Sequence, residues 1–224
     1  MSLTSVIISA KAKQTATVVW CHGLGDSGAG WSFIGEELGQ LFPYVKWVLP
    51  NAPARPIALN GGFPMPGWFD LHSLDKRILE NEDEKGIMAS SASIGQLIQE
   101  EINQGIPAER IILGGFSQGA CLSLVTGLSS QQKLAGIIAC SGWLGLSSKF
   151  ANIASETNKQ TPILMCHGDR DPVVRYEYGQ ESADKLRSLG YQISFKAYPG
   201  LVHSANEQEL ADIAQFIKKV IPPL

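Results

Sequence analysis

Short apolar runs recur along the chain at a length typical of buried strands. They are rich in Val, Ile and Leu, and most end in Gly, Pro or a polar residue. Strands that are buried on both faces show this pattern, whereas helices need longer segments. The pattern predicts strands at TATVVWC (15–21), VKWVLP (45–50), RIILGGF (110–116), LAGIIAC (134–140) and TPILMC (161–166), with a further strand at QISFKAYP (192–199).

Helical periodicity fills the intervals between several of these runs. Residues 87 to 102 place four isoleucines on one face, and the last segment of the chain has a similar apolar face. Ser204, followed three residues later by Glu207, forms a capping-box pattern that predicts the start of that last helix. The apolar positions concerned are Ile87, Ile94, Ile98 and Ile102 in the first helix and Leu210, Ile213, Ile217 and Val220 in the second.

Strands that alternate with helices predict an α/β fold, with a mostly parallel sheet and helices on both faces. We interpret residues 1–224 as a single domain. Residues from about 51 to 85 are the exception, because they are rich in Pro, Gly and aromatic residues and show neither period. This segment is too apolar for a flexible linker, so it is expected to form an ordered insertion over the sheet.

Composition and charge argue against several classes of binding partner. The chain has 18 Lys and Arg against 21 Asp and Glu, a net charge of -3, and no basic cluster, which argues against nucleic acid. No apolar run is long enough to span a bilayer and no positively charged leader is visible. We therefore expect a cytoplasmic protein whose contact with membrane surfaces is at most transient.

The four cysteines show no metal-binding or disulfide spacing. Three of them close apolar runs, at Cys21, Cys140 and Cys166, and the fourth is Cys121. Structural zinc sites need closely spaced cysteines or His and Cys clusters, and disulfides need an oxidising compartment. The sequence suggests neither. The sequence predicts buried, reduced thiols, no metal site and no cofactor.

A nucleophile motif follows the third predicted strand. Gly115-Phe116-Ser117-Gln118-Gly119 matches G-x-S-x-G, comes directly after RIILG, and precedes a segment that can begin a helix. The two glycines relieve crowding in a sharp turn from strand to helix that exposes the serine hydroxyl. Ser117 is therefore the predicted nucleophile.

Ser27 is a second candidate, since it lies in a GDSG sequence like that around the nucleophile of many serine proteases. A chymotrypsin-like site needs a histidine and an aspartate well upstream, and His22 is the single histidine before Ser27. We interpret Ser27 as structural, with Ser27 or Asp26 capping a helix that begins near Trp31.

Chain order selects the base. In α/β-hydrolases the acid and the histidine follow the nucleophile, which leaves His167 and His203. His167 precedes both nearby acids, Asp169 and Asp171, so His203 is the predicted base. Spacing alone does not separate the two aspartates. Asp171 lies later in the loop and precedes a proline that fixes a turn, whereas Asp169 is better placed to bind loop amides.

The separated motifs HGLGDSG, NAPARPIALN, MPGWFD, GGFSQGA, HGDRDPVV and GLVHS occur in this order along most of the chain. Together they closely resemble the acyl-protein thioesterase and lysophospholipase branch of the carboxylesterase family. The resemblance implies an α/β-hydrolase fold, a triad of Ser117, Asp171 and His203, and an oxyanion hole formed by the backbone amides of Leu24 and Gln118.

The resemblance also implies a substrate class. We expect hydrolysis of long-chain acyl thioesters on protein cysteines, with oxygen esters and lysophospholipids as related substrates. A small-ester carboxylesterase with the same triad is the alternative, and a non-catalytic binding module is disfavoured because every catalytic position is filled.

The candidate acyl-binding residues come from two segments. The apolar insertion either shelters an acyl chain or covers the core. The residues after the acid line the acyl site in the family, although DPVVRY here differs from the DPLVPL of many members. The candidates are Phe63, Met65, Trp68 and Phe69 in the insertion and Arg175 and Tyr176 after the acid.

Overall fold

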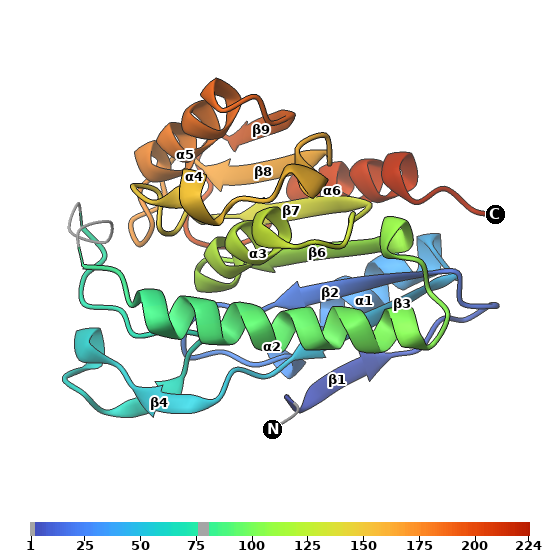
Figure 1. The fold of residues 1–224 in the computed structure, drawn as a ribbon, viewed down its shortest axis with the longest axis horizontal. Helices are drawn as coiled ribbons and strands as arrows, with labels where there is room; N and C mark the ends of the chain where they lie inside the picture. Colours follow the sequence, from blue (N-terminus) through green and yellow to red (C-terminus); the bar gives the residue numbers. More distant parts are fainter. Residues whose placement is uncertain (1–2, 76–80) are drawn as a thin grey trace.

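A seven-stranded sheet forms the centre of the molecule (Figure 1). The computed structural model describes residues 3–75 and 81–224. The strand order is β1-β3-β2-β6-β7-β8-β9, and every pairing is parallel except that of β1 with β3. The strands are β1 (Ser5–Ile8), β2 (Ala16–Cys21), β3 (Val45–Pro50), β6 (Ile111–Phe116), β7 (Gly136–Cys140), β8 (Ile163–Gly168) and β9 (Ile193–Tyr198).

All six predicted strands are confirmed, and β1 is an addition that the sequence pattern did not identify. It is a four-residue edge strand with mixed exposure, and it pairs antiparallel with β3 in a register that sets Ser5 opposite Pro50. Such a strand has neither the continuous apolar run of a central strand nor a clear alternation. Its pairing with β3 is a tertiary feature.

Helices cover both faces of the sheet, as predicted. One apolar core lies between the sheet and α2, α3 and α5, and a second lies between the sheet and α1 and α6. The predicted helix at 87–102 corresponds to α2, which begins three residues earlier. The helices are α1 (Ser32–Leu41), α2 (Glu84–Asn103), α3 (Gln118–Ser129), α4 (Phe150–Ile153), α5 (Tyr176–Ser188) and α6 (Glu207–Val220).

The predicted start of the last helix is wrong by two residues. The N-cap of α6 is Asn206, whose side-chain oxygen accepts the Glu209 N–H at 2.8 Å. Ser204 lies two residues too early, and its own N–H donates to Val202 O within the preceding loop. The backbone is extended at Asn206, so the helix can begin only after that residue.

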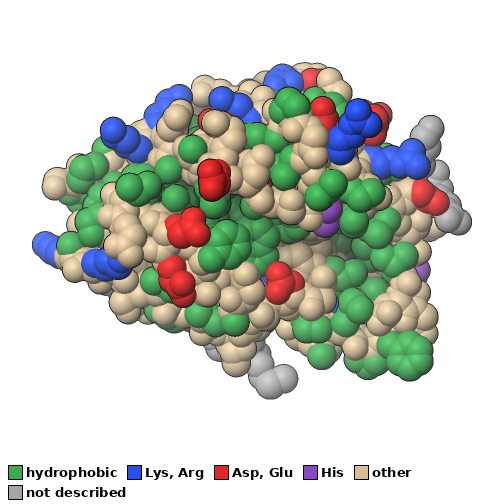
Figure 2. Space-filling model, turned by 180° about the vertical axis from the view of Figure 1, so that it is seen from behind, with side chains coloured by type: hydrophobic (Ala, Val, Ile, Leu, Met, Phe, Trp, Pro, Cys, Tyr) green, Lys and Arg blue, Asp and Glu red, His purple; other side chains and the backbone are tan. Residues whose placement is uncertain are grey.

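The insertion before α2 is more regular than its composition suggests. It contains an antiparallel hairpin, β4 (Ala54–Pro56) with β5 (Pro64–Pro66), joined through a 3-10 turn at Ala58–Asn60. The hairpin projects from one edge of the molecule, where Figure 2 shows hydrophobic side chains at the surface. Part of the predicted insertion, 76–80, lies outside the described residues.

A tight contact joins the end of β2 to the turn between β6 and α3. A Cβ atom added to Gly115 would lie 2.6 Å from Cys21 O, and one added to Gly119 would lie 2.1 Å from the same oxygen. No side chain tolerates so close a contact. Ser117, between them, has φ 55° and ψ -118°, outside the ordinary regions for a residue with a side chain. The missing side chains at both glycines therefore allow the sharp turn that the motif predicted.

Gly119→Ala tests this contact. The added methyl group meets backbone that cannot move independently, so we expect a loss of roughly 3 kcal/mol or more in the free energy of unfolding. Gly95→Ala is the matched control, because a Cβ at that position in α2 meets nothing within 4 Å. It should stabilise the protein by up to about 1 kcal/mol. Similar effects in urea unfolding would contradict the assigned contact.

Candidate active site

A cavity of about 250 Å³ opens at the carboxyl ends of the central strands. It brings together residues from the loop after β2, the turn after β6, the insertion, and the loops after β7, β8 and β9. Open α/β sheets bind their ligands at this edge. The lining residues are Gly23, Leu24, Asp26, Trp31, Leu71, Leu74, Phe116, Ser117, Gln118, Trp143, Val173 and His203.

Ser117 and His203 both line this cavity, although they are 86 positions apart in the chain. The Ser117 N–H donates to Cys140 O at 2.8 Å, which anchors the turn to the end of β7. The His203 ring packs against the Phe116 ring with centroids 4.7 Å apart. The fold thus places both predicted residues in one apolar pocket.

Asp171 is hydrogen-bonded to His203. The distance from Asp171 Oδ2 to His203 Nδ1 is 2.7 Å, and the other carboxylate oxygen accepts the N–H groups of Val173 and Val174 at 2.8 and 2.9 Å. When Nδ1–H donates to the carboxylate, Nε2 of the neutral ring is left without a proton. A histidine in this state can act as a general base.

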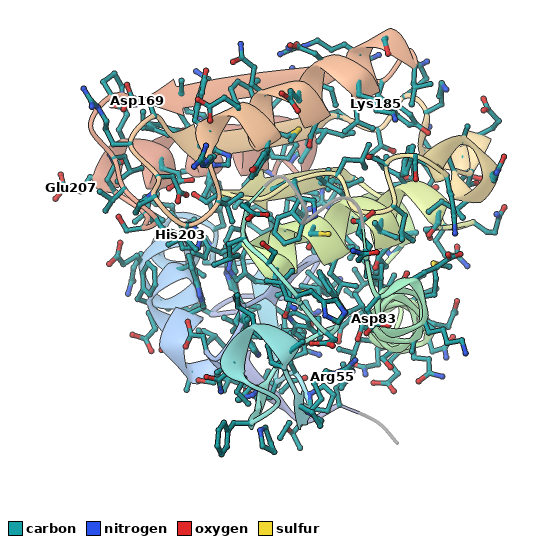
Figure 3. All side chains as sticks on the ribbon, turned by 90° about the vertical axis from the view of Figure 1, so that its left-hand side faces the viewer. Arg55, Asp83, Asp169, Lys185, His203 and Glu207 are labelled. Carbon is teal, nitrogen blue, oxygen red and sulfur yellow. The ribbon has the colours of Figure 1, made fainter. Side chains whose placement is uncertain are left out.

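Asp169 takes the structural role predicted for it. Its Oδ1 accepts the Gly200 N–H at 2.7 Å, which connects the loop after β8 to the loop that carries His203. Figure 3 shows Asp169 and His203 on the same end of the molecule. The two aspartates therefore have different partners: Asp171 binds the histidine ring, and Asp169 binds a loop amide.

His167 was excluded as the base, but the structure gives it a contact that sequence reasoning missed. It is buried, its Nε2 lies 2.8 Å from Val174 O, and the same atom lies 3.6 Å from Asp171 Oδ2. Burial lowers the pKa of His167, which favours the neutral ring. His167 thus packs against the carboxylate of Asp171. Its position in HGDRD, at the end of β8, is the sequence feature that could have indicated this contact.

The loop after β2 is held by the buried ring of His22. Its Nδ1 lies 2.6 Å from Gly23 O, and its Nε2 accepts the Ala52 N–H at 3.0 Å. Burial lowers the pKa of His22, so the ring stays neutral with the proton on Nδ1. In a trans peptide the C=O and N–H point in opposite directions. Holding Gly23 O therefore fixes the direction of the Leu24 N–H.

Both amides predicted for the oxyanion hole belong to residues that line the cavity. Among the described residues, no hydrogen bond is donated by the Leu24 N–H. Gln118 is the first residue of α3, so its N–H has no partner within the helix. Two donors are thus available beside Ser117.

The Gln118 side chain links this corner to the insertion. Its Oε1 accepts the Trp68 N–H at 2.8 Å, and its Nε2 donates to Phe69 O at 2.7 Å. The Trp68 indole in turn donates to His22 O at 2.8 Å. The insertion is consequently bonded to the elements that carry both free amides.

The predicted acyl-binding residues are not those that line the cavity. Trp68 is fully buried and Phe69 nearly so, in agreement with the alternative that they cover the core. Phe63 is 71% exposed on the hairpin with Met65 beside it, and Tyr176 packs against the His167 ring. Within the described residues, Phe63, Met65, Trp68, Arg175 and Tyr176 are absent from the lining, and Leu71, Leu74, Trp143 and Val173 supply its apolar wall.

Ser27 lies outside the cavity lining. Its hydroxyl accepts the Gly30 N–H at 3.2 Å, at the start of the 3-10 turn Ala29–Trp31 that leads into α1. Asp26 Oδ1 accepts the Ser27 N–H at 2.8 Å. Ser27 thus binds an amide within this turn, but the prediction that Ser27 or Asp26 caps the helix is wrong, because Gly28 precedes the turn, Trp31 precedes α1, and neither position has a side-chain cap.

The partly buried carboxyl group of Glu82 stabilises the wall that carries Trp143. Both oxygens of Glu82 accept the Leu146 N–H at 2.9 Å, and Leu146 has a positive φ of 53°. Burial raises the pKa of Glu82 from 4.5 to about 7. The loop after β7 is thereby tied to the segment that precedes α2.

The comparisons with known proteins agree with this architecture. A family model described as Phospholipase/Carboxylesterase matches residues 3–221. Acyl-protein thioesterase 1 of Neurospora crassa is 47% identical over 97% of this chain and 91% of its own length. The enzyme of that name from Cryptococcus neoformans is 43% identical over 98% of both chains.

Solved structures show the same fold. The crystal structure of Arabidopsis thaliana SOBER1 superposes with a TM-score of 0.86 at 34% identity, covering 92% of this chain and 99% of that one. Zea mays acyl-protein thioesterase 2 gives a TM-score of 0.83 at 31% identity, covering 97% of this chain and 99% of that one.

The fold and the site define an α/β-hydrolase. The chain belongs to the phospholipase/carboxylesterase family, among the relatives of the acyl-protein thioesterases, and is an esterase or thioesterase.

The described part of the chain contains no helix with the length and apolar character needed to cross a bilayer.

Asp171→Asn and Asp169→Asn separate the two carboxylates. An amide at 171 can present a donor to the histidine, which favours the wrong ring tautomer, so we expect turnover to fall by on the order of 10⁴-fold with a near-normal melting temperature. The same change at 169 keeps an acceptor for Gly200 and should retain most activity at a stability cost of about 1 kcal/mol. Turnover per titrated active site decides between them, and an inactive Asp169→Asn would reverse the assignment.

Glu82→Gln tests this partly buried carboxyl group. The raised pKa means that unfolded Glu82 loses its proton near pH 4.5, whereas folded Glu82 keeps it until about pH 7. The folded state therefore loses relative stability as pH rises through this window. Gln still accepts from Leu146 but does not titrate. Denaturant unfolding should show the variant gaining about 1 to 2 kcal/mol on the wild type between about pH 4 and pH 8. A constant difference would contradict this account.

Proposed function

We propose that this protein is an acyl-protein thioesterase that hydrolyses long-chain acyl thioesters on protein cysteines through an acyl intermediate on Ser117. Oxygen esters and lysophospholipids are related substrates. The observation that carries the proposal is the 2.7 Å pair of Asp171 with His203, which meets Ser117 at one apolar cavity. The names of the relatives at 47% and 43% identity support the substrate class.

His203 acts as the general base in this mechanism. Its Nε2 takes the Ser117 proton while Oγ bonds to the acyl carbon, because a serine hydroxyl is a weak nucleophile at neutral pH. Asp171 keeps the required tautomer and stabilises the imidazolium that forms. The C–S bond then breaks, and the imidazolium gives its proton to the departing thiolate. Water attacks the acyl-serine with the same base and releases the fatty acid.

The amides of Leu24 and Gln118 stabilise the oxyanion. Both N–H groups lack a partner in the described residues or within their helix, and both residues line the cavity. Fixed donors of this kind need no reorganisation as charge develops on the carbonyl oxygen. The His22 and Gln118 side chains, which bind Gly23 and the insertion, keep the two donors in place.

The apolar wall favours an acyl chain over a polar substituent. Leu71, Leu74, Trp143 and Val173 face the space beside Ser117. Asp26 is the one acidic side chain in the described lining. Burial of a hydrocarbon against such a wall stabilises binding by about 0.8 kcal/mol for each buried CH₂ group.

A substrate panel with Ser117→Ala as the blank tests the proposal. Acyl thioesters and oxygen esters of increasing chain length and a palmitoylated peptide are compared by kcat/KM. We expect hydrolysis of the palmitoylated peptide, a preference for longer chains, and a loss of on the order of 10⁴-fold or more in Ser117→Ala. Ser27→Ala is the matched control and should retain activity.

Two outcomes would reject parts of this proposal. Activity confined to short esters would support the small-ester carboxylesterase. An intact, folded wild-type protein that fails to react with a fluorophosphonate at Ser117 would support a non-catalytic binding module. Metal chelation should leave the wild-type rate unchanged, since protein amides meet the oxyanion.

A further inference from the structure

Two cysteines and a glutamate meet in the core between the sheet and α6. Each offers one ligand atom, and the three atoms lie within 4.8 Å of one another. Within the described residues, Cys140, Cys166 and Glu209 form the one group of this kind, and all three are buried. They do not line the catalytic cavity.

Strand register brings the two thiols together. Cys140 is the last residue of β7, and Cys166 is its direct partner on the parallel strand β8. Both side chains belong to the core that α1 and α6 cover. Glu209 enters from the first turn of α6, where the Asn206 cap fixes its backbone N–H. The three ligands therefore come from three rigid elements, which is a favourable scaffold for a fixed site.

The Glu209 carboxyl group is the unusual feature. It is 0% exposed, and its one polar contact among the described residues is with the Cys140 thiol, a weak donor. A buried carboxyl group with so weak a partner is costly, and proteins almost always pair such a group fully or use it to bind a metal. The nearby groups are two thiols, which are weak donors but good ligands for soft cations.

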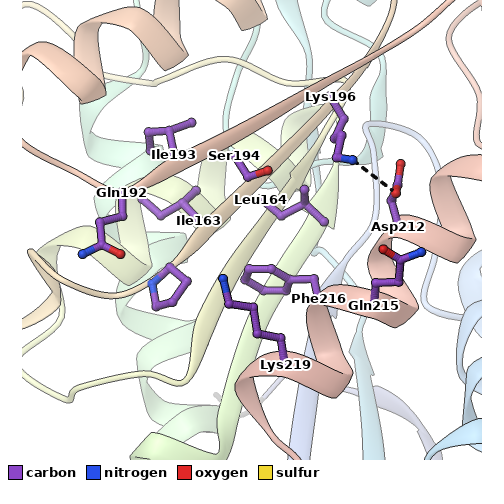
Figure 4. A pocket seen from close by; sticks show the side chains of 11 residues that line it. Ile163, Leu164, Gln192, Ile193, Ser194, Lys196, Asp212, Gln215, Phe216 and Lys219 are labelled. Carbon is purple, nitrogen blue, oxygen red and sulfur yellow. Dashed lines mark hydrogen bonds and ion pairs between the residues drawn. The ribbon is translucent and has the colours of Figure 1, made fainter.

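A polar chain connects this cluster to the surface. Cys166 Sγ lies 3.3 Å from Tyr198 Oη, which lies 3.0 Å from Asp212 Oδ2. Asp212 in turn pairs with Lys196 at 3.5 Å on the wall of an open groove of about 460 Å³ (Figure 4). This chain gives protons from the buried thiols a path to solvent. It also gives Cys166 the kind of outer hydrogen bond that orients metal ligands.

We propose that Cys140, Cys166 and Glu209 form a binding site for a thiophilic divalent cation such as Zn²⁺. Two sulfurs and one carboxylate oxygen suit a tetrahedral d¹⁰ ion, whereas Mg²⁺ and Ca²⁺ prefer sets of oxygen ligands. Binding displaces the protons of both thiols and any proton on the Glu209 carboxyl group, so one cation enters as two or three protons leave, depending on pH. Three ligand charges then face the two charges of the ion, and the carboxylate gains a strong partner in place of a thiol.

The site is separate from the catalytic groups but shares their framework. Cys140 O accepts the Ser117 N–H, and Cys166 O accepts the Ser141 N–H. A bound cation joins β7, β8 and α6 at the positions that precede Ser141 and His167. Since only the folded chain brings the three ligands together, the cation should raise the melting temperature.

Cd²⁺ is the probe, because its thiolate complexes absorb in the ultraviolet. We expect one equivalent of Cd²⁺ to produce a thiolate-to-metal absorption band, release about two to three protons into a weakly buffered solution, and raise the melting temperature. Cys140→Ala and Cys166→Ala should lose the band. Glu209→Gln should keep a band but bind at least about 10-fold more weakly, as expected for loss of a ligand.

Cys21→Ala is the matched control, since Cys21 is an equally buried thiol at the end of β2, which the sheet order separates from β7 by β6. It should bind Cd²⁺ like the wild type, as should Ser117→Ala, which makes the result independent of the catalytic proposal. The cadmium-113 NMR shift of the wild type, which reports the number of sulfur ligands, needs no core variant. No band in the folded wild type, a shift typical of oxygen ligands alone, or a band that survives in both Cys140→Ala and Cys166→Ala would overturn the site.

Discussion

The contact between the end of β2 and the turn after β6 is the constraint on which the rest of the site depends. Gly115 and Gly119 lie so close to Cys21 O that neither can carry a side chain. This contact holds Ser117 in its positive-φ conformation and sets the start of α3 beside the loop after β2. The nucleophile and the two free amides are therefore neighbours because the backbones pack without side chains between them.

The insertion completes this corner. Gln118 binds the backbone of Trp68 and Phe69, and the Trp68 indole binds the peptide that precedes Gly23. The buried aromatic residues of the insertion thus act on the site through hydrogen bonds and packing. Residues further along the insertion form part of the cavity wall. Fully satisfied polar networks of this kind favour one arrangement, because each broken bond would leave a buried group unpaired.

Fully or partly buried ionisable groups mark the places where the fold departs from an apolar core. Burial raises the pKa of Glu82 to about 7, and Glu82 uses both oxygens to hold a loop amide. Glu209 has no such partner and meets two thiols instead. Glu82 therefore stabilises the loop that forms the cavity wall, whereas we interpret Glu209 as a metal ligand.

Local rules determined much of this protein from its sequence alone. Continuous apolar runs predicted the central strands, and the motif from Gly115 to Gly119 at the end of β6 predicted the turn at Ser117, because both depend on neighbouring residues. Chain order selected His203, which the fold places beside Asp171. Only the tertiary structure showed that β1 pairs with β3, that Leu71, Leu74 and Trp143 line the cavity, and that Cys140, Cys166 and Glu209 meet. These contacts join residues far apart in the chain, and strand register and helix packing, which no local pattern encodes, set their distances.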